Sequence, residues 1–158
     1  MQTNKRKYMK CEETLDHLFD CCLFFVSQDL GRMIAKLADE AFAPTTLSPS
    51  YAILMMAVKE KGEINCSALA FCLKLSPSTI TRFVDKLLIK GFLQRQQDGK
   101  NSNVKLSRKG EEIMPKIYDA WEVFHQEYCK ILGEDFSKNL TQDILKANHL
   151  IREEKPSF

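Results

Sequence analysis

Residues 76–91, SPSTITRFVDKLLIKG, separate polar from apolar side chains with the spacing of an α-helix. One face carries apolar residues at intervals of three and four: Ile80, Phe83, Val84, Leu87 and Leu88. The opposite face carries hydroxyl and cationic side chains, flanked by Thr81 and Asp85: Ser78, Thr79, Arg82, Lys86 and Lys90. Small hydroxyl groups at a helix N-terminus allow close approach to phosphates, and a long arginine can then reach a base edge. Alone, this pattern also fits an ordinary amphipathic helix with a solvated polar face. Together with the flanking elements and the local charge described below, it predicts a helix that binds the major groove of DNA.

The positive charge of the chain is concentrated around this segment. The 158 residues include 23 Lys and Arg and 21 Asp and Glu, which gives a formal net charge of +2. Residues 74–109 contain nine of the basic and two of the acidic residues, so their net charge is +7. The rest of the chain contains 14 basic and 19 acidic residues, a net charge of −5. A polyanionic partner is therefore expected to bind this segment rather than the whole surface.

The elements that would position this segment are mostly helical. Apolar residues recur at helical spacing in five segments: residues 12–42, 49–60, 64–75, 77–90 and 108–131. A last amphipathic helix is expected toward the C-terminus. Three serines can cap helices through their hydroxyl groups, and two of them precede a proline suited to the first helical position: Ser48, Ser76 and Ser107.

Two short segments, residues 92–97 and 103–106, flank the turn-forming sequence DGKNS. This arrangement predicts a two-stranded β-hairpin. Helix, short helix, turn, helix and basic hairpin together predict a mainly α fold with a small β-hairpin wing. The core is expected to be a winged helix-turn-helix, with additional helices on its N- and C-terminal sides.

The sequence INCSALAFCLKLSPSTITRFVDKLLIKGFLQRQQDGKNSNVKLSRKGEEI resembles the winged-helix core of the MarR (multiple antibiotic resistance regulator) family. Within it, LSPSTITRFVDKLLIKGFL is similar to the family's recognition helix, and LSRKGEEI to its Leu-Thr/Ser-x-x-Gly segment after the wing. The flanking long helices also fit. The resemblance implies a homodimeric bacterial regulator that acts on a pseudo-palindromic operator. It also implies three parts: an N-terminal arm and dimerisation helix (1–43), a DNA-binding domain (44–110) and C-terminal dimerisation helices (111–158).

Site residues follow from the same pattern. The expected contacts with double-stranded DNA come from the short helix, the recognition helix and the wing: Ser67, Ser76, Ser78, Thr79, Thr81, Arg82, Lys86, Arg95, Asp98, Lys100, Asn101 and Lys105. The expected dimerisation contacts are Leu15, Leu18, Cys22, Phe25, Leu140, Ile144 and Leu145. The wing departs from the family, whose Asp-Arg-Arg is here Asp98, Gly99 and Lys100. Lysine is a less directional ligand of a narrow groove than arginine, so we expect weaker wing contacts.

Derepression by a small ligand or by oxidation is common in the family, and the sequence leaves the sensed signal open. Adjacent Cys21 and Cys22 are candidate redox sensors, whereas the simpler interpretation is that they are buried free thiols. A small-molecule effector would bind near Tyr51, Met55 and Trp121, which are equally compatible with plain core packing. Two His-x3-Cys pairs, His17/Cys21 and His125/Cys129, each place two metal ligands on one helix face. Neither has enough further ligands for a full site, so we expect no metal and no cofactor.

Other classes of protein are less well supported. The chain has six cysteines but no CxxC pair, and it contains no nucleophile motif, phosphate-binding glycine-rich loop or HExxH helix. An enzyme is therefore not expected. No apolar run reaches the ~18 residues of a membrane span, and the basic N-terminus lacks an apolar h-region. We expect a cytoplasmic protein without a membrane partner. The main alternative is an adaptor whose winged helix binds another protein.

Overall fold

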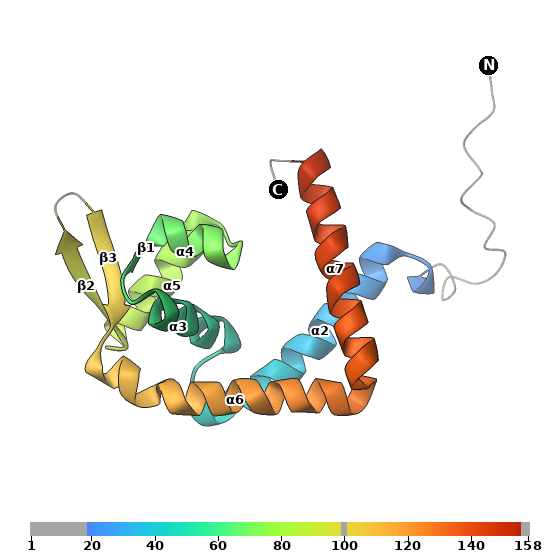
Figure 1. Cartoon of the computed structure of the whole chain (residues 1–158), viewed down its shortest axis with the longest axis horizontal. Helices are drawn as coiled ribbons and strands as arrows, with labels where there is room; N and C mark the ends of the chain where they lie inside the picture. The colour runs from blue at the N-terminus through green and yellow to red at the C-terminus, as the bar shows by residue number, and fades with distance from the viewer. Residues whose placement is uncertain (1–18, 99–100, 156–158) are drawn as a thin grey trace, which may run out of the picture. The chain divides into compact units, whose positions relative to one another are not determined.

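A computed structural model describes residues 19–98 and 101–155 (Figure 1). The chain divides into two compact units, residues 1–36 and residues 37–158, with the boundary inside the first helix, α2 (Leu23–Phe42). In the first unit, the ring of Phe25 packs edge-on against the rings of Phe19 and Phe24, at centroid distances of 4.6 and 5.4 Å. These three rings form a local aromatic cluster at the start of α2.

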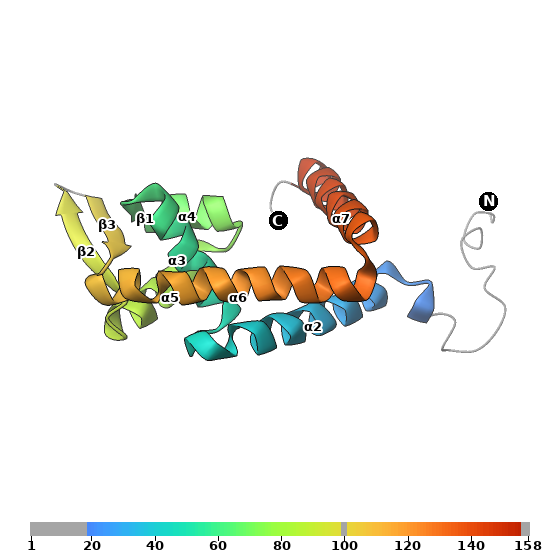
Figure 2. The same ribbon diagram turned by 60° about the horizontal axis from the view of Figure 1, so that its bottom comes forward.

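The second unit contains all the remaining elements. After the short 3₁₀ turn η1 (Ala43–Thr45), their order is α3 (Pro49–Lys61), β1 (Ile64–Asn65), α4 (Cys66–Leu73), α5 (Pro77–Ile89), β2 (Leu93–Asp98), β3 (Asn101–Leu106), α6 (Arg108–Leu132) and α7 (Glu134–Glu154). Helices α3, α4 and α5 and the strands gather around the N-terminal part of α6, and α7 follows its C-terminal end (Figures 1 and 2). The architecture is mainly helical, as the periodicity predicted.

The three strands form one antiparallel sheet in the order β1-β3-β2. β2 pairs with β3 from Leu93 opposite Leu106 to Asp98 opposite Asn101, and β1 pairs with β3 through Ile64 opposite Val104. The hairpin confirms the predicted wing, but its strands extend further toward the turn than expected. No sequence pattern predicted β1, and its two residues were expected to be helical.

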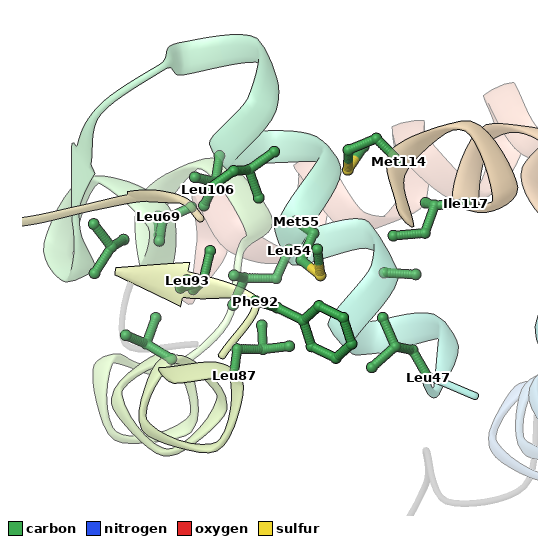
Figure 3. Close-up of a cluster of buried hydrophobic side chains, with 14 of the residues drawn as sticks. Leu47, Leu54, Met55, Leu69, Leu87, Phe92, Leu93, Leu106, Met114 and Ile117 are labelled. Atoms are coloured by element: carbon green, nitrogen blue, oxygen red, sulfur yellow. The ribbon is translucent and has the colours of Figure 1, made fainter. Parts of the chain in front are cut away.

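The core joins α3, α4, α5, the strands and α6. Figure 3 shows side chains from all of these elements converging around Phe92, among them Leu54, Leu87 and Ile117. Leu54, Leu87 and Ile117 are completely buried. Each such side chain contributes about 1.5–3 kcal/mol by leaving water. This core holds α5 by its apolar face and leaves the opposite face of the helix exposed.

Two predictions about helix starts need correction. The helix expected over residues 12–42 is interrupted at Cys21 and Cys22. Phe19 and Asp20 before the break are helical, Cys22 N–H donates to Phe19 O at 3.1 Å, and α2 begins at Leu23. Two adjacent cysteines, which are poor helix formers, fit such a break; residues 12–18 lie outside the described part of the chain. The hydroxyl of Ser48 makes no capping bond at the start of α3, although Ser48 is the N-cap residue and Pro49 the first helical residue.

Among the described residues, no single helix is long and apolar enough to cross a membrane. The bent pair Leu23–Thr45 and Pro49–Lys61 satisfies the length and composition criteria only when its two parts are taken together. The second part of this pair is α3, whose side chains Ala52, Leu54, Met55 and Val58 are buried in the core.

Candidate nucleic-acid interface

A cluster of hydroxyl groups organises the start of α5. Ser76 is the N-cap residue, and its Oγ accepts a hydrogen bond from Thr79 N–H at 3.2 Å. The same Oγ lies 3.1 Å from Ser78 Oγ and 2.8 Å from Thr79 Oγ1. Pro77 occupies the first helical position, where its missing N–H costs nothing. Ser76 thus caps α5, and its hydroxyl also bonds those of Ser78 and Thr79; all three residues were predicted to contact DNA.

The two faces of α5 differ completely in burial. Ile80, Val84 and Leu87 on the inner face have no exposed surface. The outer face exposes Ser78, Thr81, Arg82 and Lys86. Thr81 Oγ1 donates to Pro77 O at 2.9 Å, so its proton is used within the helix. Arg82 and Lys86 form no salt bridge with any other residue in the described part of the chain. They leave two cations available to an external anion.

An ion pair links α5 to the hairpin. Arg95 Nη2 lies 2.8 Å from Asp85 Oδ1, and Arg95 Nη1 donates to Ser102 Oγ at 3.1 Å. Arg95 and Asp85 side chains are both 49% exposed, so the pair contributes at most about 1 kcal/mol to stability. Its larger effect is geometric, because one guanidinium connects α5, β2 and β3. Arg95 was predicted as a DNA contact, and in this structure its guanidinium already has two protein partners.

The role of Asp85 could not be recognised from the sequence, where it appeared only as a flanking residue. Asp85 and Arg95 are separated by ten residues and a turn, so no helical or strand spacing connects them. The only available signal was a single acid on an otherwise basic helix face.

The N-terminal end of α6 anchors the C-terminal end of α5. Ser107 Oγ donates to Gly91 O at 2.6 Å and accepts from Gly110 N–H at 3.0 Å. Lys109 Nζ donates to Lys90 O at 2.8 Å and lies 4.5 Å from the centroid of the Phe92 ring. These contacts fix the turn after α5 to the first turn of α6.

Gly110 makes this close approach feasible. A Cβ atom added at Gly110 would lie 2.1 Å from the carbonyl oxygen of Phe92, a distance that real Cβ atoms do not adopt. The backbone of α6 therefore approaches residue 92 at a point where only glycine fits. The sequence identified LSRKG as a segment of interest, and the structure supplies the physical reason for its glycine.

The remaining predicted DNA contacts lie in three places. Ser67 is exposed on α4. Lys105 on β3 is partly buried, and its Nζ lies 3.4 Å from Glu63 Oε1, which reduces its availability to an anion. Asp98 and Asn101 are opposite each other in the β2–β3 strand register, at the end of the hairpin next to the turn. Lys100 lies outside the described residues.

The residues predicted to sense a signal do not form one exposed surface. Met55 is fully buried in the core, whereas Trp121 is 40% exposed. Tyr51 packs edge-on against Phe83 at 5.0 Å, and Trp121 against Phe124 at 6.3 Å, so the two predicted pocket aromatics belong to different ring pairs. Cys21 is exposed and Cys22 is partly buried, both in the turn before α2.

Burial also raises the pKa of another thiol, that of Cys66 at the start of α4. The neighbouring Arg95 guanidinium opposes this shift, and the Asp85 carboxylate adds to it. Desolvation is the larger effect, so Cys66 stays protonated at neutral pH and is a poor nucleophile.

Helix α7 buries little of its surface within one chain. Ser137 is its only buried residue. Five apolar side chains on it are about half exposed: Phe136, Ile144, Leu145, Leu150 and Ile151. The predicted dimerisation residue Leu140 is partly buried on the same helix, and Phe25 on α2 is 45% exposed. Leu15 and Leu18 lie outside the described residues. Such an exposed apolar helix is typical of a surface that binds another chain.

Helix, turn, helix and hairpin around one core define a winged helix-turn-helix protein. The family model described as "MarR family" matches residues 47–102, from the residue before the N-cap of α3 to the second residue of β3. The match covers 56 of the 158 residues, so the winged-helix core of this chain is similar to the MarR family. The comparison with curated proteins found no match.

Solved structures share the fold over most of the chain. A mutant of MarR from E. coli complexed with operator DNA has a TM-score of 0.74 and 20% identity, covering 86% of this chain and 99% of that one. The transcriptional repressor CouR bound to a 23-mer DNA duplex has a TM-score of 0.76 and 15% identity, covering 87% and 99%. CouR from Rhodococcus jostii RHA1 bound to p-coumaroyl-CoA has a TM-score of 0.67 and 20% identity, covering 89% and 96%.

Proposed function

We propose that this protein is a sequence-specific DNA-binding repressor that acts as a homodimer on a pseudo-palindromic operator. The observation that carries the proposal is the outer face of α5, where Arg82 and Lys86 are exposed and form no salt bridge among the described residues. A helix with a fully buried inner face and a cationic outer face is suited to the major groove. The hydroxyl groups around Ser76 and the N-terminal N–H groups of α5 would add contacts to phosphate.

Within this face, the side chains have different tasks. The planar guanidinium of Arg82 can donate two parallel hydrogen bonds to the O6 and N7 atoms of guanine, whereas the ammonium group of Lys86 is a compact charge suited to phosphate. Thr81 presents a methyl group and an acceptor oxygen, because its hydroxyl proton is bonded to Pro77 O. Arg95 would act mainly by holding the wing against α5 through Asp85 and Ser102.

The exposed apolar side chains of α7 support the homodimer. Ile144 and Leu145 are 43% and 53% exposed in the isolated chain. A second copy offers the same surface, and a twofold interface between identical helices would cover both. Two recognition helices related by a twofold axis fit two half-sites of opposite orientation, which is why we propose a pseudo-palindromic operator.

Release from DNA is proposed to depend on a small ligand, with thiol oxidation as a second route. CouR provides the precedent for the first, because its structure has been solved with p-coumaroyl-CoA bound. The exposure of Cys21 favours the second, because an oxidisable thiol must be accessible. The two routes separate on treatment of the protein–DNA complex: a reductant restores binding only after oxidation.

The competing function is an adaptor whose winged helix binds protein. It uses the same fold but does not require the charge asymmetry of residues 74–109, whose net charge is +7 against −5 for the rest of the chain. Duplex binding that falls steeply with salt is the behaviour that separates a DNA-binding protein from such an adaptor.

The test is a fluorescence anisotropy titration with duplex DNA from upstream of the protein's own gene. The titration is repeated at several salt concentrations and with unlabelled competitor DNA. A specific regulator binds this duplex tightly, and the logarithm of its binding constant falls linearly with the logarithm of the salt concentration. It also stays bound to this duplex when unlabelled competitor DNA is added. Weak binding that is equal for this duplex and for unrelated duplexes would contradict sequence-specific regulation from this site and favour the adaptor.

A further inference from the structure

The hydroxyl of Thr81 is turned back toward the preceding turn of α5. Thr81 Oγ1 donates to Pro77 O at 2.9 Å, four residues earlier in the helix. A threonine in a helix divides between two rotamers, because its hydroxyl can bond a carbonyl of the preceding turn. The bond to Pro77 O holds Thr81 in such a rotamer and leaves the methyl group as the other branch of the side chain. Because Thr81 is exposed on the outer face of α5, this methyl group is accessible to a molecule bound there.

The same bond restricts what the Thr81 hydroxyl can recognise. Guanine N7 and O6 and thymine O4 accept hydrogen bonds in the major groove, so they need a donor. A hydroxyl has one proton, and that of Thr81 is committed to Pro77 O. The oxygen keeps only its acceptor capacity and lies against the backbone of the preceding turn. The methyl group is therefore the part of Thr81 best placed to distinguish one base from another.

The surroundings of this methyl group are apolar on one side and already paired on the other. Pro77 is exposed one turn earlier on the same face of α5. Asp85 lies one turn later, and its carboxylate is paired with Arg95 at 2.8 Å. Residues four apart are neighbours on a helix surface. The Pro77 ring and the Thr81 methyl group thus form a small apolar spot on an otherwise polar face.

Thymine is the base that matches such a spot. Among the four bases of DNA, only thymine presents a methyl group in the major groove, and a threonine methyl group can pack against it. Adjacent residues of a helix point about 100° apart, so Thr81 lies beside Arg82 and addresses a different base. We propose that Thr81 recognises the methyl group of a thymine next to the base that Arg82 contacts. This inference rests on the proposed binding of α5 to the major groove and specifies part of the sequence recognised.

Deoxyuridine is the probe, because it pairs as thymine does but lacks the methyl group. Each thymine of the duplex from upstream of the protein's own gene is replaced singly by deoxyuridine. Binding of the full-length protein is then measured by anisotropy competition at one salt concentration. For the wild type, we expect a thymine in each half-site at which the replacement weakens binding about fourfold, the effect of burying one methyl-sized group.

Two substitutions separate the methyl group of Thr81 from its hydroxyl. Thr81→Ser keeps the hydroxyl and lacks the methyl group, so the same replacement should no longer weaken binding. Thr81→Val keeps a methyl group and lacks the hydroxyl, so the loss of about fourfold should remain. Thr141→Ser is the matched control, because Thr141 Oγ1 makes the same kind of bond on α7, to Ser137 O at 2.8 Å. It should behave as the wild type does, and circular dichroism checks that all three variants are folded.

The outcomes separate this inference from the proposed function. If the wild type binds the upstream duplex no better than an unrelated duplex, sequence-specific binding is contradicted, and recognition of thymine with it. If the wild type binds specifically but no deoxyuridine replacement weakens binding, only the inference about Thr81 is overturned. The same holds if Thr81→Ser keeps the wild-type loss or if Thr81→Val abolishes it.

Discussion

Helices α3 and α5 begin with the same four residues, Leu-Ser-Pro-Ser, yet they occupy opposite kinds of environment. In α3, Ala52, Leu54, Met55 and Val58 are buried, and charged side chains appear only in the last turn. In α5, three residues are buried and the opposite face exposes Arg82 and Lys86. The shared start determines only where a helix begins. The residues after it determine whether the helix serves the core alone or also presents a surface.

The two starts also differ in detail. Ser76 Oγ accepts the Thr79 N–H, whereas the Ser48 hydroxyl makes no capping bond although both residues have extended N-cap backbone angles. The same sequence therefore contributes differently to stability at the two positions. Substitutions in the two helices can separate their roles.

The largest expected effect is the loss of core packing in α3. Leu54 is completely buried, so Leu54→Ala removes apolar contacts and leaves a cavity. The free energy of unfolding should fall by about 2–5 kcal/mol, measured by urea denaturation at a fixed protein concentration. The control is Lys86→Ala on the outer face of α5, which should change stability by less than about 0.5 kcal/mol. Equal losses in the two variants would refute the difference between the helices.

A smaller effect is expected at the two caps. Ser76→Ala removes the bond to the Thr79 N–H and should lower the free energy of unfolding by about 1 kcal/mol. Ser48→Ala removes no capping bond and should cost only a few tenths of a kcal/mol, although the surrounding sequence is the same. The comparison uses thermal and urea unfolding of the two variants. If both substitutions lower the free energy of unfolding by the same amount, the hydroxyl of Ser48 caps α3 in solution.

The outer face of α5 can be tested by its salt dependence. Lys86→Ala should weaken binding to all duplexes and reduce the slope of log K against log salt by about 0.9, the value for one phosphate contact. Lys146→Ala on α7 is the control, because this exposed lysine lies outside the basic segment. If the slope is unchanged in Lys86→Ala, Lys86 does not contact a phosphate group.

The smallest expected effect concerns the link between α5 and the wing. A double-mutant cycle with Asp85→Ala and Arg95→Ala should give a coupling energy of about 0.2–1 kcal/mol, because the pair is half-exposed. The measurement is the unfolding free energy of the two single variants and the double variant. A coupling energy of zero would mean that the ion pair does not hold the wing in solution.

The sequence predicted those features that repeat at regular intervals. The apolar spacing of Ile80, Val84 and Leu87 identified the buried face of α5, and their burial in the core confirms it. The turn composition DGKNS likewise located the hairpin between β2 and β3. Residues on one face of a helix or strand recur at the period of that element, so their spacing can be read from the sequence.

Contacts between elements were not predictable in this way. β1 consists of two residues, too few for an alternating pattern, and it exists only because Ile64 pairs with Val104. The Asp85–Arg95 pair and the bond from Ser107 to Gly91 join residues 10 and 16 positions apart across turns. Likewise, the separation of His125 and Cys129 allowed an interaction, but only the side-chain conformations bring Nε2 and Sγ to 3.8 Å.

Competition binding of Arg82→Ala tests the proposal that the outer face of α5 recognises DNA bases. The variant and the wild type are titrated with the specific duplex and with an unrelated duplex, beside Arg108→Ala as control. Arg108 is an exposed arginine of the same basic segment, paired with Glu112 on α6. We predict that Arg82→Ala loses about 1–3 kcal/mol of preference for the specific duplex and Arg108→Ala almost none. Equal losses on both duplexes, or no loss in Arg82→Ala, would contradict base recognition by α5.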